Sequence, residues 1–184
     1  MTRMQTRHGV LLCMEEIGVL ITGNSGIGKS ELALELITRG HQLIADDAPL
    51  FNCSDDGQVI GECPAALQDF LEIRGLGILD ITALFGPAAV AARHRLDLIV
   101  HLTLEPPGTL TPEERIGGRQ STTRLCQNDI PTITLSVDPG RNLAVLVETA
   151  ARNHILKIKG YNSANEFQSR LNKLIAPRHT SSEH

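Results

Sequence analysis

The sequence predicts an α/β domain in which helices flank a mixed central sheet. The first observation is an apolar run at 17–22 that leads into a glycine-rich loop and then into a run of strong helix formers. The second is a composition of 41% hydrophobic and 3% aromatic residues, because an aliphatic core suits a buried parallel sheet covered by helices. The third is the short break Glu15-Glu16 between two apolar runs, which predicts an antiparallel pair at one edge of the sheet.

The loop at 23–30 carries the most specific signal. Its sequence, GNSGIGKS, matches the spacing G-x-x-x-x-G-K-[ST] of a phosphate-binding loop, or P-loop. The glycines of such a loop let backbone N–H groups surround phosphate oxygens, the lysine reaches the outer phosphates, and the hydroxyl can hold Mg²⁺. We therefore expect a P-loop-containing domain, and its candidate nucleotide-binding residues are Gly23, Asn24, Ser25, Gly26, Ile27, Gly28, Lys29 and Ser30. The alternative is a glycine-rich turn that binds no ligand.

Charge and composition exclude several classes of protein. A formal net charge of −4 argues against a nucleic-acid binder, which usually has a basic face. The sequence has no apolar run long enough to span a membrane and no apolar signal-peptide core, so we expect a cytoplasmic protein without membrane contact. The four cysteines (Cys13, Cys53, Cys63 and Cys126) have neither C-x-x-C nor zinc-site spacing, so we expect reduced, mostly buried thiols.

In the first half of the chain, a strand at 8–14 is expected to form a hairpin with the strand at 17–22. A helix from about Lys29 to Thr38 ends at Arg39-Gly40, a basic last turn followed by a C-capping glycine, and a strand at 41–45 follows. A polar turn at 52–57 between short apolar pieces predicts a small surface hairpin. The stretch at 71–81, LEIRGLGILDI, fits neither helical nor strand periodicity, and we interpret it as a functional loop.

In the second half, a short helix is expected at 81–85 and a buried strand at 96–102. Prolines and glycines interrupt the polar segment 105–128, which is the best candidate for a mobile loop. Alternating apolar residues predict a strand at 131–137, and Asn142 is the expected N-cap of a helix that Gly160 stops. A last polar helix at 163–174 carries apolar residues on one face, and the tail at 178–184 is expected to be disordered.

Two acids follow the strand at 41–45. Phosphoryl transfer needs a carboxylate near the metal, usually at the C-terminal end of a strand beside the strand that carries the loop. Asp46 and Asp47 satisfy this requirement, because a single helix joins their strand to the P-loop. Successive strand residues point to opposite sides, so one carboxylate can hold the metal while the other faces substrate. The alternative is a solvated strand end.

Other charged residues are weaker candidates. His8 at the start of a strand is more often a surface or packing residue. Glu72 and Arg74 lie among glycines and aliphatic residues, which indicates a loop held close to something polar or, alternatively, a helix-cap ion pair. Arg115 and Arg119, in the broken segment, can supply a mobile cation for a transferring phosphoryl group, and the alternative is a pair of solvated arginines.

Three stretches together resemble one family. GNSGIGKSELALELITRGHQLIADD, LEIRGLGILDI and DPGRNLAVLVETAARNHILK are similar to the catalytic domain of HPr kinase/phosphorylase, and the resemblance runs from about His8 to Gly160. It implies an enzyme that phosphorylates a regulatory serine of the phosphocarrier protein HPr with ATP and removes that phosphate by phosphorolysis, giving pyrophosphate. The family also suggests a homo-oligomer, a hexamer. LEIRGLGILDI is the specific part, because unrelated families share P-loops.

The resemblance also implies roles for individual residues. Gly23 to Ser30 bind ATP or pyrophosphate, with Lys29 on the phosphates, and Ser30 together with Glu72 ligates Mg²⁺. Asp47 matches the acid–base aspartate, Asp46 stands beside it, and His8 matches a histidine that assists it. Arg115 in EERIGG resembles an active-site arginine of a mobile loop, and the segment 137–142 matches one tied to dephosphorylation.

The sequence departs from the family pattern in three places. The family usually has a separate N-terminal domain, whereas here residues 1–177 are expected to form the catalytic domain alone, so regulation by that domain is expected to be absent. Asn24 stands where Asp is expected, and Asp138 stands where arginine is typical, which places a negative charge near phosphates and predicts weaker binding of a phosphorylated substrate, so the phosphorylase activity stays open. Two other functions stay open: a kinase of the same fold acting on another protein or a small hydroxyl compound, and a non-catalytic ATP-sensing module.

Overall fold

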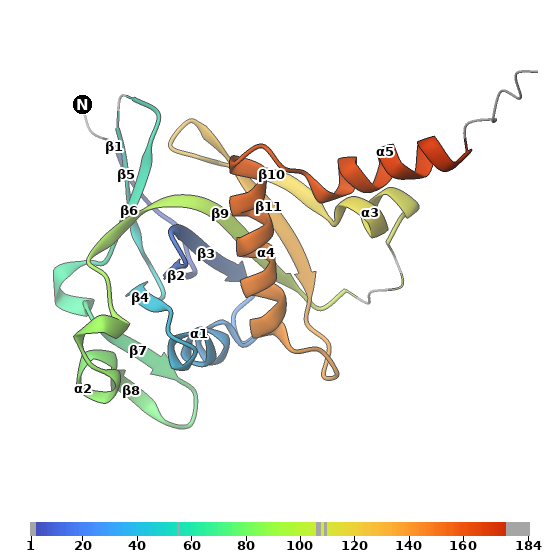
Figure 1. Ribbon diagram of the computed structural model, residues 1–184. Coiled ribbons are helices and arrows are strands. Elements are labelled where there is room, and N and C mark those ends of the chain that lie inside the picture. The colour runs from blue at the N-terminus through green and yellow to red at the C-terminus, as the bar shows by residue number, and fades with distance from the viewer. Residues whose placement is uncertain (1–2, 55, 106–107, 109, 176–184) are drawn as a thin grey trace, which may run out of the picture.

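The computed structural model describes residues 3–54, 56–105, 108 and 110–175 of the chain (Figure 1). Its elements are, in order, β1 (Arg3–Thr6), β2 (Val10–Met14), β3 (Ile17–Gly23), α1 (Lys29–Thr38), β4 (Gln42–Ala45), β5 (Leu50–Cys53), β6 (Val59–Glu62), η1 (Ala65–Leu67), β7 (Phe70–Ile73), β8 (Gly77–Asp80), α2 (Ile81–Phe85), η2 (Pro87–Ala89), β9 (Arg93–Thr103), α3 (Pro112–Gly117), β10 (Gln120–Leu125), β11 (Asn128–Ser136), α4 (Leu143–Ile158) and α5 (Ser163–Ile175). The tail predicted at 178–184 lies outside the described residues.

The central sheet is mixed, as the sequence predicts. Its strands follow the order β10-β11-β9-β3-β2-β4. Strands β11, β9 and β3 are parallel, whereas β2 is antiparallel to both of its neighbours, β3 and β4. Strand β4 therefore runs in the same direction as β3 and is separated from it by β2. The β2–β3 hairpin and the α/β fold are confirmed.

A second branch of the sheet starts from the long strand β9. Its first residues, Arg93 to Arg95, pair antiparallel with β6, and the sheet continues from β6 through β5 to β1 (Figure 1). The hairpin predicted near 50–60 is thus confirmed as the pair β5–β6, but its placement on the surface is wrong. Phe51 is fully buried and packs with Leu11 and Leu20 of the central sheet, because the long β9 brings the hairpin back over one face.

Helices cover the other face. Successive residues of β3 point to opposite sides, so that Val19 and Ile21 pack in the cluster that contains α1 and α4, whereas Leu20 faces the β5–β6 branch. Helix α4 begins where predicted, because the Asn142 side chain accepts a hydrogen bond from the backbone N–H of Val145 at 3.1 Å. Both helices lie against each other in front of the sheet in Figure 1.

The stretch LEIRGLGILDI is a hairpin rather than a loop. Strand β7 pairs antiparallel with β8, from Phe70 opposite Asp80 to Ile73 opposite Gly77. Leu71 and Ile73 are buried while Glu72 is exposed, which is the period-two pattern of a half-buried strand. Each strand has only four residues, which is too short for that period to stand out in the sequence.

The segment 105–128 also contains more regular structure than predicted. Helix α3 begins at a capping box, in which Thr111 and Glu114 each accept a hydrogen bond from the other's backbone N–H. Strand β10 then pairs with β11. The prediction of a continuous loop is therefore wrong at 112–125, because a local cap and a partner strand stabilise a sequence that lacks apolar periodicity. Residues 106, 107 and 109 lie outside the described part.

The cysteines differ from expectation as well. Cys53 and Cys126 form a disulfide, whereas Cys13 and Cys63 are free and half-buried. Burial raises the pKa of the Cys63 thiol to about 11. The prediction of four reduced thiols is wrong for the bonded pair, because 73 residues separate these cysteines in sequence and the sheet topology alone brings them together.

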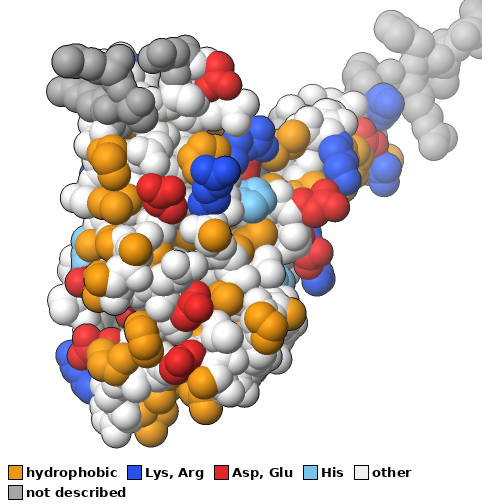
Figure 2. All heavy atoms as spheres, turned by 90° about the vertical axis from the view of Figure 1, so that its left-hand side faces the viewer, with side chains coloured by type: hydrophobic (Ala, Val, Ile, Leu, Met, Phe, Trp, Pro, Cys, Tyr) orange, Lys and Arg blue, Asp and Glu red, His pale blue; other side chains and the backbone are white. Residues whose placement is uncertain are grey.

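Large apolar side chains are exposed on several described elements, among them helix α5 and the β7–β8 hairpin. Helix α5 extends away from the body, and its predicted apolar face, formed by Phe167, Leu171 and Leu174, is exposed (Figure 1). Leu76 and Ile78 on the β7–β8 hairpin are also exposed, and Figure 2 shows orange side chains spread over the lower part of that side of the molecule. Of the helices described, none is long and apolar enough to cross a membrane.

Candidate phosphate-binding and phosphoryl-transfer site

The P-loop connects β3 to α1. Helix α1 begins after Gly28, which has a left-handed conformation (φ 100°) and no side-chain cap for the first turn. A β-carbon at this position would be strained, so glycine is required here. The N–H groups at an uncapped helix start favour an anion, because they carry the positive end of the helix dipole. This geometry fits the phosphate groups of a nucleotide.

Lys29 is held against the loop. Its Nζ donates hydrogen bonds to the carbonyl oxygens of Gly23, at 3.0 Å, and Asn24, at 3.1 Å. The residue is only 8% exposed. A buried ammonium group needs compensation, which the two carbonyls provide. The charged group of Lys29 therefore already lies beside the loop, where phosphate oxygens can replace the two carbonyl oxygens as its hydrogen-bond partners.

The order of the strands explains how His8 reaches Asp47. Because β2 runs antiparallel between β3 and β4, the residues before β2 lie at the same edge as the C-terminal ends of β3 and β4. His8 Nδ1 lies 3.0 Å from Asp47 Oδ1, and both side chains are more than half exposed. The sequence predicted the acids beside the strand of the P-loop. This prediction is wrong, because β2, which follows His8, lies between β3 and β4.

Two features fix the backbone of this pair. Gly9 approaches β3 so closely that an added β-carbon would lie 2.5 Å from the carbonyl oxygen of Ile21. Its N–H donates a hydrogen bond to the carbonyl oxygen of Asp47 at 3.0 Å. Asp47 itself has a positive φ of 65°, which is uncommon for a non-glycine residue and frequent at functional sites. The orientation of Asp47 is thus set by its positive φ and by the hydrogen bond from Gly9, not by regular strand geometry.

Asp46 has a different environment from Asp47. Its carboxylate accepts hydrogen bonds from the backbone N–H groups of Asp47, at 2.9 Å, and Glu72, at 3.0 Å. Burial raises the pKa of Asp46, and these two hydrogen bonds oppose the increase. Asp46 therefore ties β7 to the end of β4 and brings Glu72 to the pocket.

The pocket that these residues enclose has a volume of about 240 Å³. Among the candidates from the sequence, it is lined by His8, Ser25, Gly26, Gly28, Lys29, Ser30, Asp46, Asp47 and Glu72. Gly23, Asn24 and Ile27 belong to the same loop but do not line the pocket.

Four lining residues, Gly9, Val10, Glu31 and Arg74, were not in the predicted site. The sequence indicates Arg74, with Glu72, as a charge held close to something polar but gives it no role in the site. Its guanidinium nitrogens lie 3.5 and 3.9 Å from where a β-carbon on Gly26 would be, so the group borders the P-loop.

Arg115 and Asp138, which lie outside the P-loop, are not brought into the pocket either. Arg115 lies on α3, exposed, and is absent from the pocket lining. Asp138 lies in the turn before α4, where its Oδ1 accepts a hydrogen bond from the N–H of Gly140 at 3.3 Å. Within the described residues, no group of three His, Cys, Asp or Glu side chains forms a preassembled metal cluster.

Fold and pocket together define a P-loop α/β protein with a carboxylate pair and an imidazole facing its phosphate-binding loop. The chain belongs to the family described as the HPr Serine kinase C-terminal domain, whose model matches residues 1–171. It is 50% identical over 175 residues to the HPr kinase/phosphorylase of Xylella fastidiosa (strain M12), covering 94% of this chain and 55% of that protein. It is 51% identical over 173 residues to that of Stenotrophomonas maltophilia (strain K279a), covering 93% and 54%.

A solved structure agrees with this assignment. The Hpr(Ser) kinase/phosphatase from Coxiella burnetii superposes with a TM-score of 0.80 at 40% identity, covering 89% of this chain and 98% of that one. The curated relatives are longer, and the chain spans about half of their length.

Proposed function

We propose that this chain transfers the γ-phosphoryl group of ATP to a serine hydroxyl of the phosphocarrier protein HPr. The observation that carries the proposal is the pair His8–Asp47, with 3.0 Å between Nδ1 and Oδ1, in the same pocket as Lys29 of the P-loop. A pure nucleotide sensor needs the loop but has no use for a carboxylate–imidazole pair opposite it. The membership in the HPr Serine kinase family supports HPr as the acceptor.

Nucleotide binding is the task of the loop and the first turn of α1. Backbone N–H groups of 23–30 surround the phosphates, and Lys29 exchanges its two carbonyl partners for phosphate oxygens. Arg74 lies beside Gly26 and adds a second positive charge at the rim of the loop. Together these groups hold the phosphoryl donor in one orientation, which is the main protein contribution to phosphoryl transfer.

Asp47 is the proposed general base. Its exposed carboxylate accepts the proton of the serine hydroxyl as the oxygen attacks, and it returns that proton in the reverse direction. His8, at 3.0 Å, orients the carboxylate and adjusts its basicity. Asp46 acts indirectly, because its hydrogen bonds to the backbone of Asp47 and Glu72 hold both residues in place.

The donor set of the pocket fits Mg²⁺. The Ser30 hydroxyl and the Glu72 carboxylate line one pocket and supply the oxygen ligands that this ion prefers. The ion, when bound, neutralises charge on the phosphates. Mg²⁺ sites commonly use only one or two carboxylates, with water and substrate phosphates as the other ligands, so Ser30 and Glu72 would suffice although the described residues contain no preassembled three-residue cluster.

Three further assignments complete the proposal. Arg115 stabilises the transferring group after α3 moves toward the pocket, which is feasible because α3 contains no buried residue. Phosphorolysis, giving pyrophosphate, is weak because Asp138 carries a negative charge in the turn at 137–142. The protein acts in the cytoplasm as a homo-oligomer, a hexamer, on HPr and not on nucleic acid or membranes.

The test uses HPr, ATP and Mg²⁺ with the wild-type chain. Mass spectrometry of HPr should show one phosphoserine, and HPr with that serine replaced by alanine should remain unmodified. A small hydroxyl compound is added as a competing acceptor. Its phosphorylation in preference to HPr would indicate the alternative function, a kinase of the same fold with another substrate. Tight ATP binding without any transfer to HPr would contradict the proposal.

A further inference from the structure

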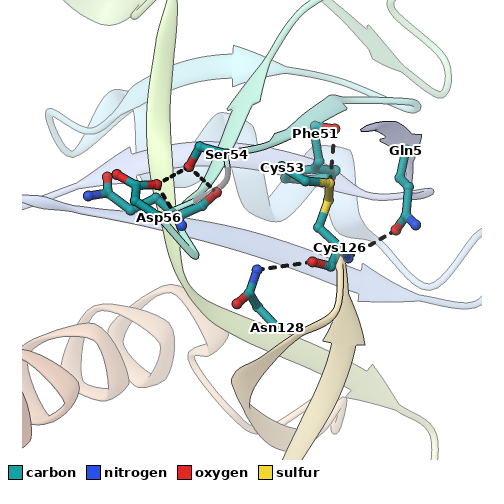
Figure 3. Close-up of a disulfide and its surroundings, with 8 residues drawn as sticks. Gln5, Phe51, Cys53, Ser54, Asp56, Cys126 and Asn128 are labelled. Atoms are coloured by element: carbon teal, nitrogen blue, oxygen red, sulfur yellow. Dashed lines mark hydrogen bonds between the residues drawn. A yellow bond between two sulfur atoms is a disulfide. The ribbon is translucent and has the colours of Figure 1, made fainter. Parts of the chain in front are cut away.

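We propose that Cys53 and Cys126 form a reversible disulfide clamp that restrains the β10–β11 hairpin together with α3, and that reduction of this bond releases them. The two Cα atoms are 5.4 Å apart, although 73 residues separate the cysteines in sequence. Figure 3 shows the bond between the end of β5 and the turn that connects β10 to β11. It thus joins the two branches of the sheet that diverge from β9.

Cys126 stands at a position that does not suit its side chain. Leu125 pairs with Asn128, so Cys126 and Gln127 form a two-residue hairpin turn, and both have positive φ values of 54° and 64°. Asn-Gly is the sequence that favours such a turn, because both central residues need positive φ, which asparagine tolerates and glycine adopts freely. Turn geometry therefore gives no reason for a cysteine at 126, whereas a bond to Cys53 does.

The clamp lies at the buried end of an otherwise exposed strand. In the part of the sheet that the structure describes, β10 is an edge strand that pairs with β11. Most of its residues are exposed, and Leu125 is the buried one. Leu125 and Cys126 pack in the cluster that contains Phe51 and Val59 of the β5–β6 branch. The apolar attachment of β10 to the body is therefore concentrated where the disulfide lies.

Helix α3 is joined to this hairpin by the chain and by the ion pair of Glu114 Oε1 with Arg119 Nε at 3.4 Å. It precedes β10 directly and contains no buried residue. Besides the disulfide, three polar contacts reach Cys126: its N–H donates to Gln5 Oε1 at 3.1 Å, its carbonyl oxygen accepts from Asn128 Nδ2 at 3.0 Å, and its sulfur lies 4.0 Å from the Phe51 carbonyl oxygen (Figure 3). Local opening is easiest where buried apolar contacts are few. Loss of the covalent bond therefore lowers the cost of opening along 112–125.

The chemical step is a thiol–disulfide exchange with a dithiol reductant. A thiolate of the reductant attacks the sulfur of Cys53, which is half-buried, whereas Cys126 is 6% exposed. The Cys53–Cys126 bond breaks, Cys126 leaves as a thiolate and takes up a proton, and a mixed disulfide forms at Cys53. The second thiol of the reductant resolves this intermediate, so two electrons pass to the protein and the reductant becomes a disulfide.

The consequence for activity rests on the proposed function, in particular on the role of Arg115. In the disulfide-bonded structure, Arg115 lies outside the pocket, so α3 must move for it to reach the phosphates. The clamp restrains the strand that follows α3 and opposes this movement. Disulfides of cytoplasmic proteins are mostly redox-sensing or transient. We therefore expect the reduced form to be the faster kinase and the oxidised form to be restrained.

Hydrogen exchange of oxidised and dithiol-reduced protein tests the clamp independently of activity. Amides of 112–125 should exchange roughly tenfold or more faster after reduction, whereas those of α1 should be unchanged. Cys53→Ser should exchange like the reduced wild type under oxidising conditions. Cys13→Ser, which removes a free cysteine, is the matched control and should keep the redox response. Identical exchange in both redox states, or two free thiols at 53 and 126 under oxidising conditions, would overturn the clamp.

Transfer to HPr, measured on the same samples, tests the regulatory part. The oxidised form should transfer more slowly than the reduced form at saturating ATP, with equal nucleotide affinity. Equal transfer rates for the oxidised and reduced forms, together with a clear change in hydrogen exchange, would contradict the proposed regulation but not the disulfide clamp. Absence of transfer in both forms would contradict the proposed function and leave the exchange result to decide the clamp.

Discussion

Glu148 on α4 connects the two elements that carry the site. Its carboxylate accepts hydrogen bonds from Arg39 Nε at 2.9 Å and from Arg39 Nη2 at 2.7 Å, and His41 Nε2 lies 2.9 Å from Oε1. Arg39 follows α1, which begins at the P-loop, and His41 precedes β4, which ends at the two acids. Glu148 is 8% exposed, so its charge is compensated almost entirely by these partners.

The size of this contribution follows from the pKa of Glu148. Hydrogen bonding to Arg39 lowers the pKa from 4.5 to about 2, burial opposes this change, and His41 supports it. A carboxyl group with a lowered pKa contributes stability that is present above its unfolded pKa and is lost as the pH falls toward its folded pKa. At about 1.4 kcal/mol per pKa unit, the upper limit is roughly 3 kcal/mol. Because the Arg39 side chain is 36% exposed, solvent screening reduces the expected value to about 2 kcal/mol.

We therefore expect Glu148→Gln to lower the free energy of unfolding by about 2 kcal/mol at neutral pH. The difference from wild type should shrink as the pH falls from 4.5 to about 2. Urea titrations over this pH range measure it. Glu35→Gln is the control, because that carboxylate lies 4.0 Å from Arg39 and is 48% exposed, so its loss should be within about 0.5 kcal/mol. An equal loss for Glu148→Gln at neutral and acidic pH would refute the electrostatic reasoning.

Three further predictions concern the pocket. Lys29→Met should weaken ATP binding by roughly tenfold or more, measured by calorimetry, because the phosphates lose a charged partner; unchanged affinity would contradict the assigned role. Gly9→Ala should destabilise the fold by about 1–3 kcal/mol in thermal unfolding, since the new β-carbon would meet the Ile21 carbonyl oxygen; a neutral effect would mean that β2 shifts freely. Asp46→Asn should retain part of the kinase activity, because an amide oxygen can still accept one of the two backbone hydrogen bonds, and complete loss in a transfer assay would assign Asp46 a direct role.

The P-loop and its flanking elements could be predicted because their signals are local. A fixed spacing from Gly23 to Ser30, an apolar run before it and helix formers after it determine strand, loop and helix. The acids at 46–47 were predictable for the same reason. The interposed position of β2 was not, because it depends on which strand pairs with which over a long sequence distance.

The remaining features depend on tertiary contacts. The β7–β8 hairpin is too short for its periodicity to be read, although buried Leu71 and Ile73 fix its orientation. The pairing of Cys53 with Cys126 depends on β9, which pairs with β6 at its start and with β11 further along, so that two branches distant in sequence share one strand. The sequence indicates Arg74 beside Glu72, but its position next to Gly26 depends on the fold.

The most direct test of the central claim is single-turnover transfer from ATP to HPr by wild type and by Asp47→Asn. General-base assistance contributes about 10²- to 10⁴-fold, so the variant should be slower by that factor while its ATP affinity remains close to wild type. Because Asp47 is exposed and lies at the end of β4, the substitution should leave the stability nearly unchanged. Transfer at the wild-type rate by Asp47→Asn would contradict the assignment of this pocket as a phosphoryl-transfer site that uses Asp47 as its base.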